Sequence, residues 1–209
     1  MRIVSVNVGR PRAVEHEGER ILTSIFKAPV AGRVRVARLN IAGDEQSDLT
    51  VHGGRDKAVY AYPSEHYAFW HRELPDAALP WGAFGENLTI EGLTEDRVAV
   101  GDRMRIGNVE LAVTTPRLPC FKLGIRFGRA DMIKRFMASL RSGFYLAVLN
   151  EGEIGAGDPV ELVPAEGDRV TIREIFSLFL PRPDLRIAKR ASVLPGLPES
   201  WRERMRERL

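Results

Sequence analysis

The sequence predicts a mainly β-stranded domain, a sandwich or a barrel, followed by a short helical region. Short runs that alternate apolar and polar residues fill the first part of the chain. Glycine-rich turns separate these runs, as in antiparallel β structures. From about residue 170 the chain changes to helical spacing interrupted by prolines. With 209 residues, the chain has room for one large domain and a small appendage.

The predicted strands follow one another through this first part. Residues 2–8 and 32–39 alternate cleanly, which is typical of strands with one buried face. The pair Gly107-Asn108 lies between two such runs and favours a tight hairpin turn. The predicted strands are 2–8, 32–39, one at Val51, 58–62, 88–90, 103–106, 109–114, 143–149 and 157–163.

Two helices are expected within the β-rich part and three beyond it. Residues 64–74 follow a Pro-Ser start signal, and residues 130–140 carry apolar side chains at helical spacing. The predicted helices of the tail are 174–180, 185–191 and 198–209.

The tail helices are too short to form a core by themselves. We therefore expect a β domain over residues 1–165 and a three-helix extension over residues 170–209. The extension docks on the β domain or on a second subunit, and the second arrangement makes a homodimer. The docking residues we expect are Trp201, Leu197 and the cluster Ile175, Phe176 and Phe179.

Composition narrows the class of protein. The net charge is +3, and acidic residues are interleaved with the arginines, so we do not expect nucleic-acid binding. No apolar run is long enough to cross a bilayer, and the N-terminal residues resemble a strand rather than a signal peptide. One cysteine excludes an internal disulfide and fits a reducing compartment. We therefore expect a cytoplasmic protein without a membrane partner.

That single cysteine, Cys120, is the most informative residue. Pro116 and Pro119 precede it and hold the approach to the thiol out of regular structure. Arg117 and Lys122 are close in sequence and favour the thiolate, the form that reacts and binds metals. The two interpretations at this point are inert packing and chemistry.

Two other polar segments are candidates for a site. Residues 43–60 contain paired glycines, and His52, Arg55 and Lys57 are suited to binding an anion; the alternative is a solvated loop. No spacing typical of a zinc site supports a metal there. In residues 82–89, Glu86 and Asn87 either bind the local backbone or face a ligand.

These segments together resemble the MOSC family, named from the C-terminal domain of molybdenum cofactor sulfurases, and in particular its stand-alone bacterial branch. The matching motifs are Gly43 to Asp48, Val51 to Pro63, Gly85 to Thr89 and Thr115 to Leu123, and the resemblance covers about residues 1–165. The tail resembles the three-helix extension of that branch. The resemblance implies a twisted, mostly antiparallel β-barrel with a cysteine at a pocket.

The resemblance also implies a function: an oxidoreductase that uses molybdenum cofactor (molybdopterin) to reduce N-hydroxylated bases or related compounds. Cys120 is then the catalytic residue and metal ligand. Thiolate is a suitable soft ligand for molybdenum. The cofactor-binding residues expected are His52, Lys57, Glu86, Asn87 and Arg117.

The expected partners are an N-hydroxylated small molecule and an external electron-donor protein, since one cysteine cannot build a Cys₄ iron–sulfur cluster. The alternative function is a carrier of persulfide sulfur or of molybdenum cofactor that turns over no substrate.

Overall fold

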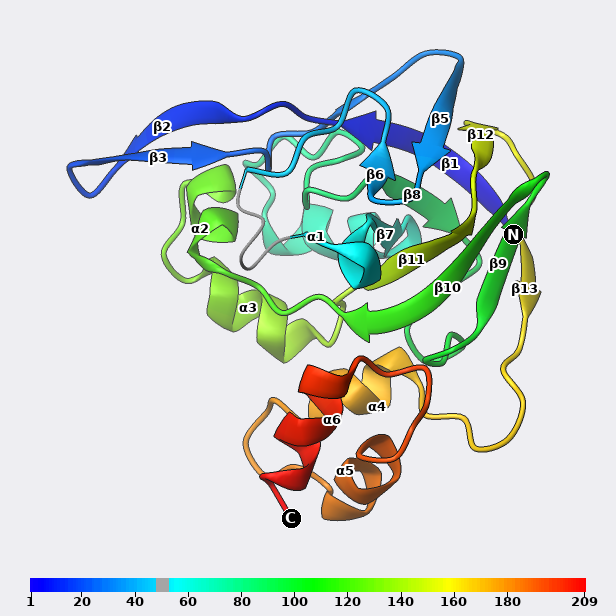
Figure 1. The fold of residues 1–209 in the computed structure, drawn as a ribbon. Helices are drawn as coiled ribbons and strands as arrows, with labels where there is room; N and C mark the ends of the chain where they lie inside the picture. The colour runs from blue at the N-terminus through cyan, green and yellow to red at the C-terminus, as the bar shows by residue number, and fades with distance from the viewer. Residues whose placement is uncertain (48–52) are drawn as a thin grey trace.

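The computed structural model describes residues 1–47 and 53–209, and most of its regular structure is β-strand. The strands of its largest sheet are β1 (Arg2–Val8), β4 (Ala28–Pro29), β7 (Val59–Pro63), β8 (Leu88–Glu91), β9 (Arg103–Ile106), β10 (Val109–Pro116), β11 (Phe144–Asn150) and β13 (Glu161–Val163). Their order is β13-β9-β10-β11-β7-β8-β1-β4 (Figure 1). Every pair is antiparallel except β7 with β8, which is parallel.

This sheet curls into a half-barrel because the start of β1 reaches the segment before β13. The Ile3 amide donates to the Asp158 carbonyl at 2.9 Å, and the Gly157 amide donates to the Ile3 carbonyl at 2.8 Å. These bonds bring strands from distant positions in the sheet order together at one end. The expected mainly β, twisted and mostly antiparallel fold is thereby confirmed.

Two smaller sheets complete the β structure. One has the order β12 (Gly152–Gly155), β5 (Arg33–Ala37), β6 (Asn40–Ile41). The other is a hairpin of β2 (Arg12–His16) and β3 (Glu19–Thr23) that extends away from the body of the molecule (Figure 1). This hairpin was not predicted, because charged residues lie on both of its faces and obscure the alternation.

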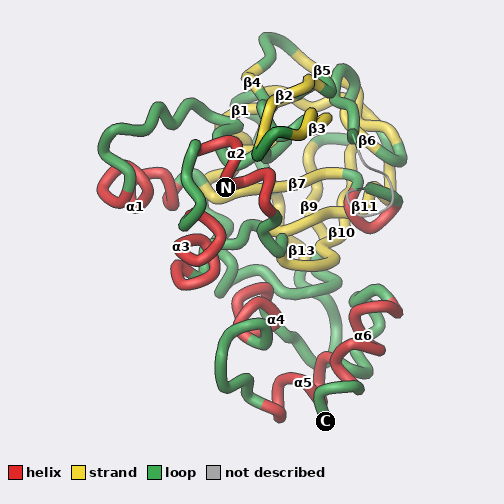
Figure 2. The backbone as a smooth tube through the Cα atoms, turned by 90° about the vertical axis from the view of Figure 1, so that its left-hand side faces the viewer, coloured by secondary structure: helices red, strands yellow, loops and turns green. Residues whose placement is uncertain are grey.

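The helices near the sheet are partly those expected. Helix α1 (Glu65–Glu73) and helix α3 (Met132–Ser139) lie where the spacing predicts them, and η1 (Arg55–Lys57) is a short 3₁₀ turn. Helix α2 (Phe121–Phe127) was not predicted. It begins directly after Cys120 and ends at Gly128, whose φ of 62° is left-handed and so favours glycine. Figure 2 shows these helices beside the strands.

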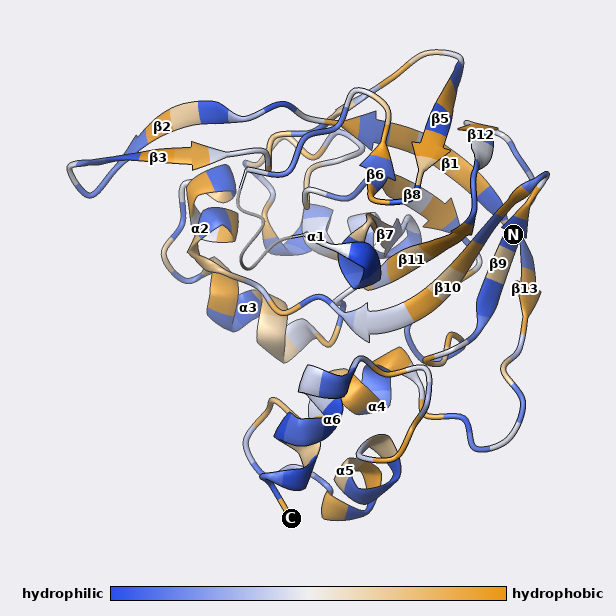
Figure 3. Ribbon diagram, viewed as in Figure 1, coloured by the Kyte–Doolittle hydropathy of each residue, from blue (hydrophilic) through white to orange (hydrophobic). Residues whose placement is uncertain are grey.

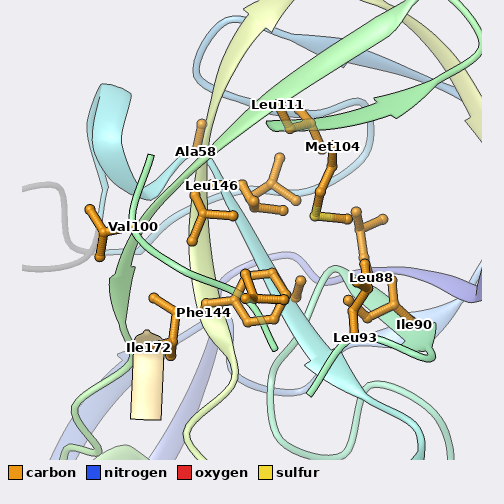
Figure 4. Close-up of a cluster of buried hydrophobic side chains, with 14 of the residues drawn as sticks. Ala58, Leu88, Ile90, Leu93, Val100, Met104, Leu111, Phe144, Leu146 and Ile172 are labelled. Atoms are coloured by element: carbon orange, nitrogen blue, oxygen red, sulfur yellow. The ribbon is translucent and has the colours of Figure 1, made fainter. Parts of the chain in front are cut away.

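The tail contains α4 (Ile172–Ser177), α5 (Leu185–Ala191) and α6 (Glu199–Arg206), and it packs against the sheet. Helix α4 is the most clearly apolar of the three and α6 is mostly hydrophilic (Figure 3). Ile172 lies with Val100 and Phe144 in the hydrophobic core (Figure 4). Leu197 is also buried in this core, and Trp201 packs on it while contacting Phe179 at 5.3 Å between ring centroids. The segment between β13 and α4 contains the predicted boundary near residue 165, and the division into two domains stays a prediction.

A second hydrophobic cluster is rich in aromatic side chains and lies outside the core of the sheet. Tyr62, Trp70, Phe84 and Phe136 are each fully buried in it. The rings of Tyr62 and Phe84 stack with centroids 4.6 Å apart. This aromatic cluster packs behind the polar residues described next.

Among the described residues, no helix has the length and apolar character needed to span a membrane.

Candidate functional site

A pocket opens where four loop segments meet near the ends of β3, β6, β7 and β10. The segment after β3, the segment after β6, the turn before β8 and the residues around the start of α2 all contribute to its wall. The residues that line it are Thr23, Ser24, Ile25, Lys27, Asp44, Glu45, Gln46, Ser47, Lys57, Tyr60, Gly85, Asn87, Arg117, Cys120, Lys122 and Tyr145.

Cys120 lies in this wall and is half-buried. It occupies the N-cap position of α2 in an extended conformation, with φ −120° and ψ 173°. Its carbonyl accepts a hydrogen bond from the Leu123 amide at 2.9 Å. The extended backbone that the two prolines predict therefore ends at the thiol, and the helix fixes the position of the residue.

Arg117 supplies a buried positive charge beside the thiol. Only 6% of the residue is exposed, and Nη1 donates to the Phe84 carbonyl at 2.8 Å. The guanidinium carbon lies 5.1 Å from the ring centroid of Tyr60 and 5.5 Å from that of Phe136. Burial lowers the pKa of Arg117, but Tyr60, Tyr145 and Cys120 outweigh it and raise the pKa above its ordinary value. Arg117 is therefore a permanent cation at the site.

Two tyrosines accompany Arg117 in the pocket wall. The hydroxyl of Tyr60 donates to the Ser142 carbonyl at 2.8 Å, and the ring of Tyr145 lies 5.2 Å from that of Tyr60. Burial raises the pKa of both phenols, although Arg117 opposes the shift. Both phenols therefore stay protonated at neutral pH, and Tyr60 uses its one O–H donor in the bond to Ser142.

Lys57 also reaches the pocket, from the η1 turn. Its Nζ lies 5.9 Å from the centroid of the Tyr145 ring. Burial lowers the pKa of Lys57, and Asp56 partly opposes this. The Lys57 carbonyl accepts from Nε2 of Gln46 at 3.3 Å, which ties the turn to the segment after β6.

Asn87 and Glu86 are neighbours with different roles. Asn87 lines the pocket: its Oδ1 accepts from the Tyr60 amide at 3.0 Å, and its Nδ2 donates to Oδ2 of Asp44 at 2.9 Å. Glu86 is fully buried and is not among the lining residues. Its carboxylate accepts from the amides of Gly82 at 2.9 Å and Phe84 at 3.1 Å. The structure therefore places Glu86 behind the wall, where it shapes the turn rather than facing a ligand.

Further donors to the Glu86 carboxylate are the hydroxyl of Thr89, at 2.9 Å, and the hydroxyl of Tyr67. Burial raises the pKa of this carboxyl, and these hydrogen bonds oppose the rise.

The sequence argument did not assign three charged residues of the wall, Lys27, Asp44 and Glu45, and two of these, Lys27 and Asp44, are buried together. They form an ion pair whose side chains are 9% and 2% exposed. Asp44 belongs to a motif that the sequence does reveal, but no local pattern marks Lys27, because it follows an unpredicted hairpin. The predicted residue His52 and the strand predicted at Val51 lie outside the described residues. Within the described part of the chain, no group of three or more His, Cys, Asp or Glu residues is arranged to hold a metal ion.

The geometry defines a class of protein: a curled β domain with a cysteine in a pocket lined by four cationic side chains. A family model described as MOSC domain matches residues 48–161, and the chain belongs to the MOSC-domain family.

Curated relatives support this membership. The chain is 38% identical to "Uncharacterized protein YflK" of Bacillus subtilis over 96% of its own length and 90% of the relative's. It is 37% identical to "Protein YiiM" of Escherichia coli over 89% of its own length and 84% of the relative's. A protein of Gibberella moniliformis named "Reductase" is 35% identical over 77% of this chain, which corresponds to 29% of that protein.

A solved structure agrees with the fold. The crystal structure of YiiM from Geobacillus stearothermophilus superposes with a TM-score of 0.82 at 37% sequence identity. The superposition covers 100% of this chain and 98% of that chain. The tail therefore belongs to the shared fold as well as the β-rich part.

Proposed function

We propose that this protein is an oxidoreductase that uses molybdenum cofactor to reduce N-hydroxylated bases or related compounds, with Cys120 as the metal ligand. The observation that carries the proposal is the position of the Cys120 thiol in one pocket with Arg117, Lys27, Lys57 and Lys122. Membership of the MOSC family supports the cofactor. The fungal relative named a reductase supports the reaction class, although this chain corresponds to less than a third of that protein.

The residues of the pocket fit the chemistry of such a group. A thiolate is a soft ligand of the kind that binds molybdenum. Cationic side chains suit the negatively charged phosphate of the pterin. In addition, the Ser24 hydroxyl in the same wall is buried without a hydrogen-bond partner among the described residues. A buried hydroxyl without a partner costs stability unless a ligand satisfies it.

Each residue then has a distinct task. Cys120 ligates the metal, while Arg117 and Lys57 bind the anionic parts of the cofactor. Asn87 fixes the Tyr60 backbone and the Asp44 carboxylate around the ligand. When bound, the cofactor supplies the two-electron redox chemistry that reduction of an N–O bond requires. The electrons come from an external donor protein, because the chain has only one cysteine and cannot hold its own Cys₄ iron–sulfur cluster.

The test pairs metal content with turnover. Protein purified from a molybdenum-replete host is analysed for molybdenum per folded chain and assayed for reduction of 6-hydroxylaminopurine with a chemical reductant. Bound molybdenum together with turnover is the expected result. Cyanide-releasable sulfur without molybdenum contradicts it and assigns the protein to the carrier class.

A labelling control distinguishes the oxidoreductase and the carrier from a protein in which Cys120 only packs in the core. Native protein is treated with a thiol reagent, and Cys120 is expected to react because it lies in an open pocket. A thiol that reacts only after unfolding contradicts a role for Cys120 in either function.

A further inference from the structure

Glu95 and His66 form a buried pair that lies outside the pocket wall and has no role in the chemistry of Cys120. Oε2 of Glu95 lies 2.6 Å from Nε2 of His66. A carboxylate only accepts hydrogen bonds, so Nε2 of His66 is the donor. Taking a carboxylate out of water is costly unless hydrogen bonds replace its hydration, and Glu95 makes a second such bond.

The second bond of Glu95 is to the backbone just before β11. Oε1 of Glu95 accepts from the Gly143 amide at 2.6 Å. Gly143 has a φ of 61°, which is left-handed and so favours glycine. A Cβ atom at this position would lie 2.5 Å from the Ala61 carbonyl oxygen and 2.7 Å from Cε2 of Tyr60. The Gly143 backbone is therefore packed closely against β7 and is bonded by Glu95 as well.

The residue before Gly143 contacts the pocket wall. Ser142 is fully buried, and its carbonyl accepts from the Tyr60 hydroxyl at 2.8 Å. This bond uses the single O–H donor of Tyr60, so only the lone pairs of the phenol oxygen remain for other partners. Arg117 carries only donors, and its guanidinium carbon lies 5.1 Å from the Tyr60 ring centroid. The orientation of the Tyr60 hydroxyl therefore suits its cationic neighbour.

His66 restrains the carboxylate of Glu95 from helix α1. The ring of His66 meets that of Tyr62 edge-on, with the centroids 5.4 Å apart. Tyr62 is fully buried, and its hydroxyl accepts from Nε1 of Trp70 at 2.6 Å. The imidazole thus packs on a side chain that is itself fixed. Rotation of the Glu95 carboxylate would break its bond to His66 or its bond to Gly143.

We infer that Glu95 is a positioning residue for the pocket, which holds the Gly143 amide and thereby keeps the Ser142 carbonyl where the Tyr60 hydroxyl donates to it. Tyr60 in turn presents its ring and its oxygen to Arg117. The effect of Glu95 on cofactor retention rests on the proposed function. Its effect on the Tyr60 hydroxyl follows from the hydrogen bonds alone.

The first experiment follows the Tyr60 hydroxyl in full-length protein made in a host that lacks molybdenum cofactor. Tyrosine labelled with ¹³C at Cζ gives one NMR signal for each of the four tyrosines, and Tyr60→Phe assigns the signal of Tyr60. Glu95→Ala removes the acceptor of the Gly143 amide, so the Tyr60 signal should shift. Glu95→Gln keeps an acceptor oxygen for that amide, and its NH₂ group can donate to the other tautomer of His66. The Tyr60 signal should therefore keep its wild-type position in Glu95→Gln.

Asp102 provides the matched control for the loss of a buried carboxylate. It is fully buried outside the pocket wall and accepts from the amides of Ala99 and Ala165, both at 2.8 Å. Asp102→Ala should lower the unfolding midpoint and leave the Tyr60 signal unchanged. A Tyr60 signal that does not move in folded Glu95→Ala, or that moves equally in Asp102→Ala, overturns the positioning role.

A shorter acid covers the case in which Glu95→Ala does not fold. Glu95→Asp keeps the charge but lacks one methylene, so its carboxylate cannot reach both His66 and Gly143. The Tyr60 signal should shift in Glu95→Asp as well. A wild-type signal in this variant also overturns the positioning role.

The second experiment measures molybdenum per folded chain in protein from a molybdenum-replete host. We expect retention to fall several-fold in Glu95→Ala and by a similar factor in Tyr60→Phe. Since Glu95 acts through the Tyr60 hydroxyl, combining the two substitutions should cause no further loss, whereas losses that multiply contradict the inference. Wild-type protein that retains no molybdenum refutes the proposed function alone, because the NMR experiment uses protein without the cofactor.

Discussion

The tail interface and the pocket wall are both buried, but the tail interface consists of apolar side chains whereas the pocket wall contains charged ones. Ile172, Ile175 and Leu178 of the tail join the apolar core of the sheet. The pocket wall instead buries Arg117 and the Lys27–Asp44 pair. Apolar contacts are non-directional and tolerate small shifts, whereas buried charges require particular partners at particular distances. The tail is thus suited to stability and the wall to binding.

The two regions meet at one residue. Phe176 of α4 belongs to the aromatic cluster, and its ring lies 6.5 Å from that of Phe136. The guanidinium carbon of Arg117 lies 5.5 Å from the centroid of the same Phe136 ring. Ile175, the residue before Phe176, packs into the core of the sheet instead. This pair of residues allows the two regions to be tested separately.

The largest expected effect is on stability. Phe176→Ala should lower the free energy of unfolding by about 3–5 kcal/mol, and Ile175→Ala by about 2–5 kcal/mol, because each leaves a cavity in a close-packed site. Urea denaturation measures both. Only Phe176→Ala should also change the rate at which iodoacetamide alkylates Cys120. Equal alkylation rates in the two variants would mean that the tail and the pocket are independent.

The next effect concerns the buried cation. Arg117→Lys keeps the charge but loses the planar guanidinium, whose Nη1 donates to the Phe84 carbonyl, and we expect cofactor retention to fall about tenfold. Arg117→Ala should cost about 1.5–3 kcal/mol of binding, or about one to two decades in affinity. Molybdenum per folded chain is the measurement. Arg97→Lys, outside the pocket wall, is the control, and full occupancy in Arg117→Ala would place the anchor elsewhere.

The smallest effect is a pH dependence that belongs to Glu86. Burial raises the pKa of this carboxyl above its ordinary value of 4.5. Between the unfolded and the higher folded value, the native state binds more protons, so the free energy of unfolding falls as pH rises through that interval. Glu86→Gln does not titrate, so the wild type should lose stability relative to it as the pH rises through this interval. Urea denaturation from pH 4 to 7 tests this; a constant difference between the two proteins contradicts it.

The same contrast explains what the sequence could predict. Alternation predicts the bounds of β9 because this strand has one buried face. It also predicts the bounds of β1, although both faces of that strand carry buried residues. Helical spacing likewise predicts α5, whose observed bounds are Leu185–Ala191. The β2–β3 hairpin was not predicted, since charged residues lie on both of its faces and obscure the alternation. Helix α2 was hidden by the prolines before it, although Gly128 is a recognisable end signal.

The sequence predicted only those residues of the candidate site that belong to recognisable motifs. Cys120, Arg117 and Asn87 do meet in one pocket with Lys57. Glu86 shares a motif with Asn87, but successive side chains point in different directions, and the sequence does not show which of them faces the cavity. The sequence could not identify Lys27 as a residue of the pocket wall. Its position there depends on Asp44, which is 17 residues away, and on a hairpin that was not predicted.

The measurement that tests the central claim most directly is the molybdenum content of wild-type and Cys120→Ser protein, purified side by side from a molybdenum-replete host. Serine preserves the shape of the residue but is a poor ligand for a soft metal. We predict bound molybdenum in the wild type and its loss from a Cys120→Ser protein that unfolds at the same urea concentration. Equal molybdenum in both proteins would contradict the assignment of Cys120 as the metal ligand.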